Sequence, residues 1–561
     1  MSHAFWILAK YRALIFGRLA VRAGWARTVV VLAYLILSLS IALGVFYFFS
    51  QAFARLLSEP YSGPVIISYA VELSLAIAMV LGVISFVISS TSVLFRNRDT
   101  ENRFALPVSP QTIFWQRFIG LTLLSAWPIL LVAVPALAAL GVVLSAPLVY
   151  YLSMIPVLLL FSVLISVTGG IVSFLIAALL QRMPLILTYG AEAVLFLVVA
   201  VAGTRRVINS EVFTLLSAIT PQAAEAAEVR LDELFGSLPS HPFAKVFLSV
   251  FAEQLSGDPV AGLGLTALVV SVLILVLAFL ARRYYRPLWQ SYGEGDFVAR
   301  REDVVETAPR TLSAFPRFFK WGHGYLFEKD LLMLFRSPSE LSRALFMLLL
   351  LLLYLLAVQI VSSLDFISTA ADLTALLTFV FIAIAYFTVT VGLRFAFPSF
   401  SLEGQGAWML WVSPLHHHEI LFWKYTFWTA LTLIAMEAVA GLAIYLFGVP
   451  FLLGTFLVFV TAATVLSLTA ITLCIGAIWP DFKMKNPDSL STSPPGLLAL
   501  ALSLLFVWVM ARYTHSFVDG YLSAGSLDLT SLAAILVLTT AVVMFFMIVS
   551  RQAIERLEVG R

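Results

Sequence analysis

Apolar runs long enough to cross a lipid bilayer recur along the whole of this 561-residue chain. A transmembrane helix needs about 20 consecutive, mostly apolar residues. Charged residues make up only 12% of the chain, against about 25% in a soluble domain. Because the bilayer core offers no partner to a free backbone N–H or C=O group, each run must satisfy its own hydrogen bonds as a helix. The sequence therefore predicts an all-α, polytopic membrane protein.

We expect about 12 transmembrane helices, arranged as two six-helix halves with a charged stretch between them. The first six candidate spans lie near residues 28–50, 67–95, 118–145, 148–180, 184–203 and 261–281. The second six lie near residues 342–363, 371–396, 421–447, 450–479, 495–512 and 527–549. The chain then divides into a membrane half over 1–281, a cytoplasmic linker with an interfacial helix over 282–341, and a second membrane half over 342–561.

The basic residues are distributed unevenly between the two sides of this predicted topology. Of the 34 Lys and Arg residues, 28 fall in segments on the same side as the N-terminus and 6 in segments on the other side. Cytoplasmic loops of membrane proteins carry such an excess. The distribution predicts that both chain ends are cytoplasmic, in a multi-pass protein of the cell (cytoplasmic, inner) membrane.

A short surface element recurs at the same topological place, after the second span of each half. Its order is an acidic residue, an apolar patch, a Val-Ser-Pro turn, a short apolar helix and a basic residue. The residues in question are Glu101, Val108, Ser109 and Pro110 with Arg117 in the first half, and Glu403, Val412, Ser413 and Pro414 with Lys424 in the second. Serine can cap free helix amides, and proline fits the first helical turn. Both copies therefore predict a surface stretch followed by a sharp turn into the next span.

Two further segments carry helix signals outside the spans. Residues 327–337 place Leu331, Leu334 and Phe335 on one helical face, with Lys329 on another, which is typical of an amphipathic helix at a membrane surface. The loop over 204–260 is long and semi-polar, and we expect short helices in it that dip back toward the membrane. That loop is either an exit lid or a plain connector. The equivalent loop over 513–526 is brief.

Three glutamates fall within candidate spans, namely Glu72, Glu192 and Glu437. Carboxylates in a membrane are costly, and they usually face a cavity or a partner. They could lie on a substrate or proton path, or they could join helices by hydrogen bonds. The sequence offers no obvious basic partner at the same depth.

Metal, cofactor and nucleic-acid sites are not expected. The run His416-His417-His418-Glu419 cannot point three consecutive side chains to one helical face, and zinc motifs use a spacing of four residues. The single cysteine, Cys474, excludes an internal disulfide and a thiol cluster. A net charge of +3 is too small to indicate nucleic acid.

ATP hydrolysis by this chain is excluded by its lysines. A phosphate-binding loop requires Gly-x-x-x-x-Gly-Lys followed by Ser or Thr. None of the seven lysines follows a glycine. The chain is therefore not expected to be an ATPase.

The repeated surface element, the six-plus-six spans and the long loop between the fifth and sixth spans resemble the permease subunit of an ATP-binding-cassette (ABC) exporter of the type 2 class. The run from Gly476 to Pro487, followed by Ser493-Pro494-Pro495-Gly496, is similar to the same place in fused two-half bacterial members. The resemblance implies an outward-moving transporter. The abundance of Leu and of Phe, with 45 Phe residues, suggests that its cargo is apolar or amphipathic. The resemblance also implies a separate ABC ATPase subunit, in two copies, that docks at Glu101, Glu403 and the two Val-Ser-Pro turns.

Two other classes of membrane protein share part of this pattern. The main alternative is an ion-coupled secondary transporter of the major facilitator type, which also has six plus six spans. Its second-to-third loop normally carries Gly-x-x-x-Asp-x-x-Gly-Arg/Lys, whereas this chain has no glycine between Leu94 and Gly120. A membrane glycosyltransferase would need clustered acids, and the chain contains no Asp-x-Asp.

Overall fold

The computed structural model describes residues 25–58, 62–95, 104, 108–180, 229–249, 259–293, 324–336, 344, 347, 350–351, 354, 370–407, 416–482, 490–491 and 493–559. Over these residues the chain is helical and contains no strand, so the predicted all-α membrane class is confirmed. Nine of the described helices are long and apolar enough to cross a membrane, or ten if one bent helix is counted. The expected span near 184–203 and most of that near 342–363 lie outside the described residues.

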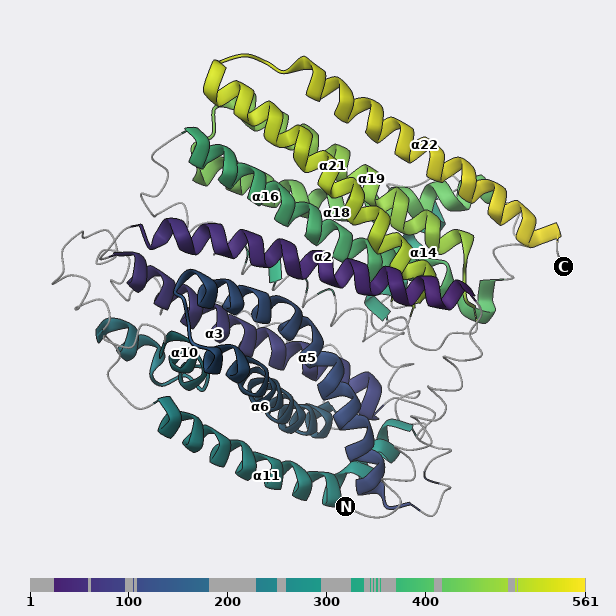
Figure 1. The fold of residues 1–561 in the computed structure, drawn as a ribbon. Coiled ribbons are helices and arrows are strands. Elements are labelled where there is room, and N and C mark those ends of the chain that lie inside the picture. The colour runs from purple at the N-terminus through teal and green to yellow at the C-terminus, as the bar shows by residue number, and fades with distance from the viewer. Residues whose placement is uncertain are drawn as a thin grey trace. The chain divides into compact units, whose positions relative to one another are not determined.

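The chain forms two compact units, and each is described by itself. The first comprises Met1–Thr311 with Pro338–Phe346, and the second comprises Leu312–Ser337 with Met347–Arg561. The long helices of the first unit are α2 (Trp25–Leu56), α3 (Ser62–Ser90), α5 (Pro110–Val143), α6 (Leu148–Leu180) and α11 (Pro259–Gly293), with the short α10 (His241–Leu248) before α11 (Figure 1). Helix α5 bends by 40° between Trp127 and Ile129, because Pro128 removes a backbone donor.

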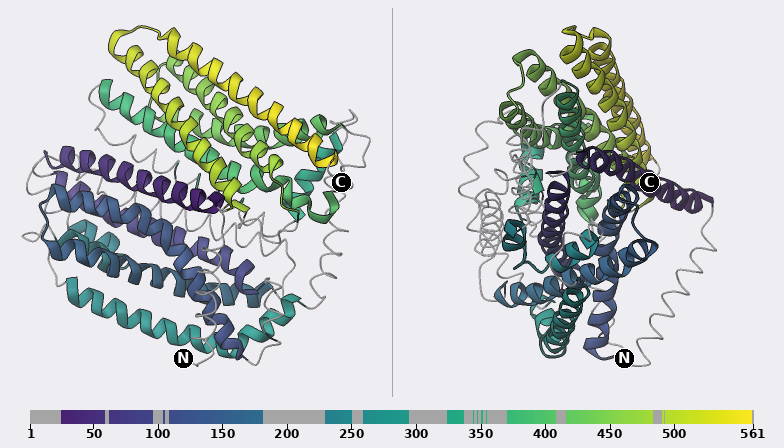
Figure 2. Two further views of the ribbon diagram at one scale, coloured as in Figure 1. Left: turned by 45° about the vertical axis from the view of Figure 1, so that its right-hand side comes forward. Right: turned by 60° about the vertical axis from the view of Figure 1, so that its left-hand side comes forward.

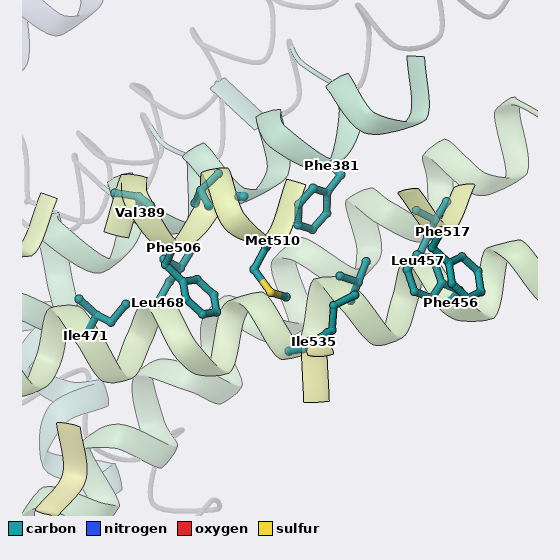
Figure 3. Close-up of a cluster of buried hydrophobic side chains, with 14 of the residues drawn as sticks. Phe381, Val389, Phe456, Leu457, Leu468, Ile471, Phe506, Met510, Phe517 and Ile535 are labelled. Carbon is teal, nitrogen blue, oxygen red and sulfur yellow. The ribbon is translucent and has the colours of Figure 1, made fainter. Parts of the chain in front are cut away.

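The second unit is built around α19 (Phe451–Ile478). Its other helices are α14 (Gly324–Arg336), α16 (Ala370–Val391), α18 (His417–Leu446), α21 (Pro494–Ala524) and α22 (Leu529–Val559). Helix α19 contacts α16, α18, α21 and α22, and the long helices run side by side in both views (Figures 1 and 2). The apolar core between them includes Phe381, Leu468, Met510 and a stacked pair, Phe456 and Phe517, whose ring centroids are 3.6 Å apart (Figure 3).

The predicted loop over 513–526 is wrong in extent. Helix α21 continues to Ala524 and ends at Gly525, whose φ of 63° is the left-handed conformation that a helix end often requires. The charged residues Arg512 and Asp519 end the apolar run, but they do not end the helix, because backbone hydrogen bonds depend on local geometry rather than on polarity. Asp528 then accepts backbone N–H bonds from Thr530 and Ser531 at the start of α22.

The second span of each half ends in the same irregular way. Helix α3 passes into a π-helical turn, η1 (Thr91–Phe95), and α16 passes into η4 (Gly392–Ala396). After η4 come two 3₁₀ turns, η5 (Phe397–Ser399) and η6 (Ser401–Gly406). A Cβ atom on Gly476 of α19 would lie 2.0 Å from the Phe397 carbonyl oxygen, and one on Gly392 would lie 2.8 Å from Thr472 Oγ1. The end of α16 therefore lies directly against α19.

Candidate functional site

Four charged side chains meet in the second unit, and we call them the Lys424 cluster: Lys329, Asp330, Glu403 and Lys424. Lys424 lies two turns into α18, Glu403 in η6, and the other two residues are neighbours in α14. Lys424 Nζ lies 2.8 Å from Glu403 Oε1 and 3.2 Å from Asp330 Oδ1. Lys329 donates to the same Glu403 oxygen. The cluster thus joins three elements that are far apart in the sequence.

The interior of this cluster is almost free of solvent. The side chain of Lys424 is 1% exposed, that of Asp330 5% and that of Glu403 10%, whereas that of Lys329 is 35% exposed. Buried charges are tolerated when they are paired and hydrogen-bonded. Two lysines and two carboxylates balance one another in formal charge, and Lys424 also donates to the Ser399 carbonyl at 3.4 Å. The Lys424 cluster is therefore satisfied internally.

Apolar contacts hold α14 in position for this pairing. Phe327 packs its ring edge against Phe427 of α18, with centroids 4.8 Å apart, and Leu326 is buried. The Lys424 ammonium also lies 5.4 Å from the centroid of the Phe400 ring, at the boundary between η5 and η6. A helix at 327–337 was predicted, and α14 is that helix. What the sequence did not predict is that its polar side would pair with the surface element.

The structure brings together the acidic and the basic ends of the second copy of the surface element, Glu403 and Lys424. Val412, Ser413 and Pro414, which lie between them, fall outside the described residues. The described helix begins at His417, and Glu419 accepts a hydrogen bond from the His416 backbone N–H at 3.0 Å. The His-rich run thus contributes a helix start.

In the first copy, the predicted helix start is observed. Ser109 caps α5 and accepts from the Thr112 N–H at 3.3 Å, Pro110 is the first helical residue, and Val108 packs against the apolar core of its unit. Arg117 is 6% exposed and donates to the Val93 carbonyl in η1 at 2.6 Å. Glu101 lies outside the described residues. In each unit, then, the basic residue of the element donates to a backbone carbonyl at or just beyond the irregular end of the preceding span.

The in-span glutamates have different surroundings. Glu72 has a basic neighbour after all, because His241 Nδ1 lies 2.7 Å from Glu72 Oε1. This partner comes from the 204–260 loop, 169 residues away in the sequence. Glu437 is half-buried on α18, and neither carboxylate oxygen has a hydrogen-bond partner among the described residues. Glu192 lies outside those residues.

His241 opens a second group, which we call the Glu72 cluster: Glu72, Asp232, His241 and Lys245. His241 Nε2 lies 3.7 Å from Asp232 Oδ1, and Lys245 Nζ lies 3.0 Å from Asp232 Oδ2. Helices are present in this loop as expected, and α10 buries Phe243, Ala244, Phe247 and Leu248 among the helices of the first unit. Neither cluster is a metal site: within the parts of the chain that the structure describes, no group of three or more His, Cys, Asp or Glu residues could hold a metal ion.

A comparison with protein families gives one match. The model of a family described as "Putative ATP-binding cassette" matches residues 25–559 of the 561. Searches of curated proteins and of solved structures give no match. The family match covers both units, so it includes the Lys424 and the Glu72 clusters.

Proposed function

This chain belongs to the "Putative ATP-binding cassette" family, and we propose that within it the protein is the membrane-spanning permease of an ABC exporter. It is a multi-pass helical membrane protein related to ABC systems. The proposed permease moves an apolar or amphipathic cargo outward, with both chain ends in the cytoplasm of the cell. The energy comes from two copies of a separate ABC ATPase subunit.

The lysines of the chain support the permease role over that of the ATPase. An ATPase of this kind holds nucleotide phosphates with a lysine that follows a glycine in a tight loop. No lysine of this sequence occupies such a position. The proposal therefore assigns ATP hydrolysis to another chain and the membrane path to this one.

The observation that carries the proposal is the double attachment of Glu403. Its Oε1 contacts Lys424 in α18 at 2.8 Å and also contacts Lys329 in α14. If an ATPase displaces the surface element, the movement of η6 must pull on α18 and α14, because Glu403 is bound to a lysine of each helix. In this proposal, the Lys424 cluster transmits movement at the surface to the spans, and Glu101 has the same role in the first half.

The partner is tested by purifying the tagged chain from its native membranes in mild detergent. We expect a second chain with a phosphate-binding loop, at two copies per permease. Charge reversal at Glu101, which lies in the proposed docking surface, should weaken retention of the ATPase. Glu555→Arg on the exposed end of α22 should not. Recovery of the permease alone under all conditions would contradict the proposal.

Coupling is tested without knowledge of the cargo. A cysteine replaces the fully buried Val518, far along α21 from the cluster, in a Cys474→Ala background. We expect its labelling rate in the permease–ATPase complex to change when ATP and vanadate are added. Glu403→Gln should remove that change with the ATPase still bound, whereas Glu555→Gln should keep it. An unchanged response in Glu403→Gln would rule out a coupling role for the cluster.

A further inference from the structure

The segment 229–249 of the first unit is attached to the bundle by apolar contacts of both its helical stretches and by a polar contact between them. Its helical stretch at 229–235 packs Leu231, Leu234 and Phe235 against Val65 and Tyr69 of α3. Helix α10 inserts Phe243, whose ring lies 5.1 Å from that of Phe161 in α6. Between these apolar contacts, His241 reaches Glu72 of α3. The segment is thus a helical hairpin in which the pair Glu72–His241 is a close charged contact to the spans.

His241 lies between two carboxylates, and this position determines which protonation state of the ring suits both contacts. Nδ1 lies 2.7 Å from Glu72 Oε1, and Nε2 lies 3.7 Å from Asp232 Oδ1. The remaining charged group of the cluster is Lys245, which lies 3.0 Å from Asp232. From α3 the titratable groups near the histidine are Glu72 and Tyr69, and α6 contributes Tyr150, which packs against Phe247 of α10, and Tyr151. Helices α6 and α11 carry no Asp, Glu, Lys or Arg at this end. Two carboxylates therefore face one lysine and one imidazole.

A neutral imidazole can donate a hydrogen bond from only one of its two nitrogens. It would then turn a bare nitrogen toward a carboxylate and leave Glu72, whose side chain is 5% exposed, as a buried charge without a cation in contact. One proton bound by the pair removes this conflict, either on the ring or on Glu72. Loss of that proton leaves a buried carboxylate that only release of the hairpin into water can relieve.

We propose that the hairpin 229–249 is a proton-held latch, closed on α3 when the pair Glu72–His241 holds a proton and released when it loses it. Because the proton belongs to the coupled pair, pH is the variable that closes or releases the latch. Release uncovers the apolar residues of α10 and opens this end of the first unit. The inference stands apart from the permease proposal, because it needs neither an ATPase nor a cargo.

The test measures the accessibility of Ala244, which is fully buried in α10. Ala244→Cys is introduced into the full-length Cys474→Ala chain, and its maleimide labelling rate is divided by that of Ser237→Cys, an exposed position on the same hairpin. The ratio cancels the effect of pH on thiol chemistry. We expect it to rise about tenfold between about pH 5.5 and about pH 8.5. The same ratio for the buried Ala139→Cys of α5 should stay constant.

Variants separate the latch from general loosening. His241→Gln and Glu72→Gln should each make the Ala244→Cys ratio independent of pH, while Lys245→Met, which leaves the pair intact, should preserve the rise. The Ala244→Cys chain with Glu72 and His241 unchanged supplies a test that does not depend on a substitution within the pair. A flat ratio across the pH range in that protein overturns the proposal, and so does a His241→Gln protein that keeps the wild-type pH profile.

Discussion

The Lys424 cluster and the Glu72 cluster meet the same requirement with different chemistry. Each places a buried glutamate beside a basic group from another element, namely Glu403 of η6 beside Lys329 and Lys424, and Glu72 of α3 beside His241. In the Lys424 cluster, Lys424 and Asp330 are both almost fully buried, and the cations are lysines. In the Glu72 cluster, Asp232 is 46% exposed, and the group that touches Glu72 is a histidine.

This difference in chemistry makes the Lys424 cluster a permanent attachment and the Glu72 cluster a pH-dependent one. Lysine keeps its charge throughout the physiological range, and removing one member of a buried pair leaves the others uncompensated. Histidine gains or loses its charge within that range. We infer that the second unit holds its surface element to the spans throughout the physiological pH range, whereas the first unit holds its hairpin under some conditions and not others.

The largest effect is expected for Lys424→Met, which leaves Asp330 and Glu403 buried with only the half-exposed Lys329. Loss of one partner of a buried ion pair costs about 3–5 kcal/mol. The apparent unfolding temperature in detergent should fall sharply, and adding Asp330→Asn and Glu403→Gln should recover part of it. Arg551→Met, which breaks an exposed pair with Glu555, is the control. Equal unfolding temperatures for Lys424→Met and Arg551→Met would remove the distinction between the two clusters.

A smaller effect is expected for Glu72→Gln, which keeps the shape but removes the charge that faces His241. Leaving a buried polar group without its partner costs about 1–3 kcal/mol. Because the latch closes with a proton, the stability difference from wild type should be larger near about pH 5.5 than near about pH 8.5. The deficit of Lys424→Met should not vary with pH over that range. Thermal unfolding at both pH values measures this, and parallel pH profiles would count against it.

Within the Lys424 cluster, Lys329→Met should cost less than about 1 kcal/mol, because its side chain is 35% exposed and water screens the pair. Glu403 keeps Lys424 at 2.8 Å in this variant. The unfolding temperature should therefore lie close to that of wild type. A loss as large as that of Lys424→Met would mean that the cluster has no distinct interior.

The smallest change is expected at Asp528, a helix cap that belongs to neither cluster. Hydrogen bonds from the hydroxyls of Ser531 and Thr530 hold the pKa of its carboxyl group well below the usual range. A lowered pKa contributes stability that is present above the ordinary carboxyl pKa, near about 4, and is lost as the pH falls further. Asp528→Asn should therefore be slightly less stable than wild type at neutral pH, and the two should converge in acid. Acid titration of unfolding measures this convergence, and a gap that widens in acid would contradict it.

Local features of this protein were predictable, and long-range pairings were not. The apolar runs predicted the membrane helices, and the Ser109–Pro110 step predicted the start of α5, because both depend on neighbouring residues. The pairing of Lys424 with Asp330 joins residues 94 positions apart. Lys424 itself was visible as the basic end of the repeated element, but nothing in its neighbourhood specified two carboxylates. The sequence shows that the carboxylate of Glu72 is costly within a span, but its partner lies in a loop whose fold the sequence does not determine.

The glycine contacts between the end of α16 and α19 have a mechanical consequence. At Gly476 the Phe397 carbonyl oxygen lies where a side chain would begin, so the two backbones are in direct contact with no side chain between them. Soft packing absorbs small displacements, whereas a backbone crossing of this kind does not yield. We expect this rigid contact to act as a pivot between the η6 turn, which carries Glu403, and α19. A small displacement of η6 would then be passed to α19, which touches all the other long helices described in its unit.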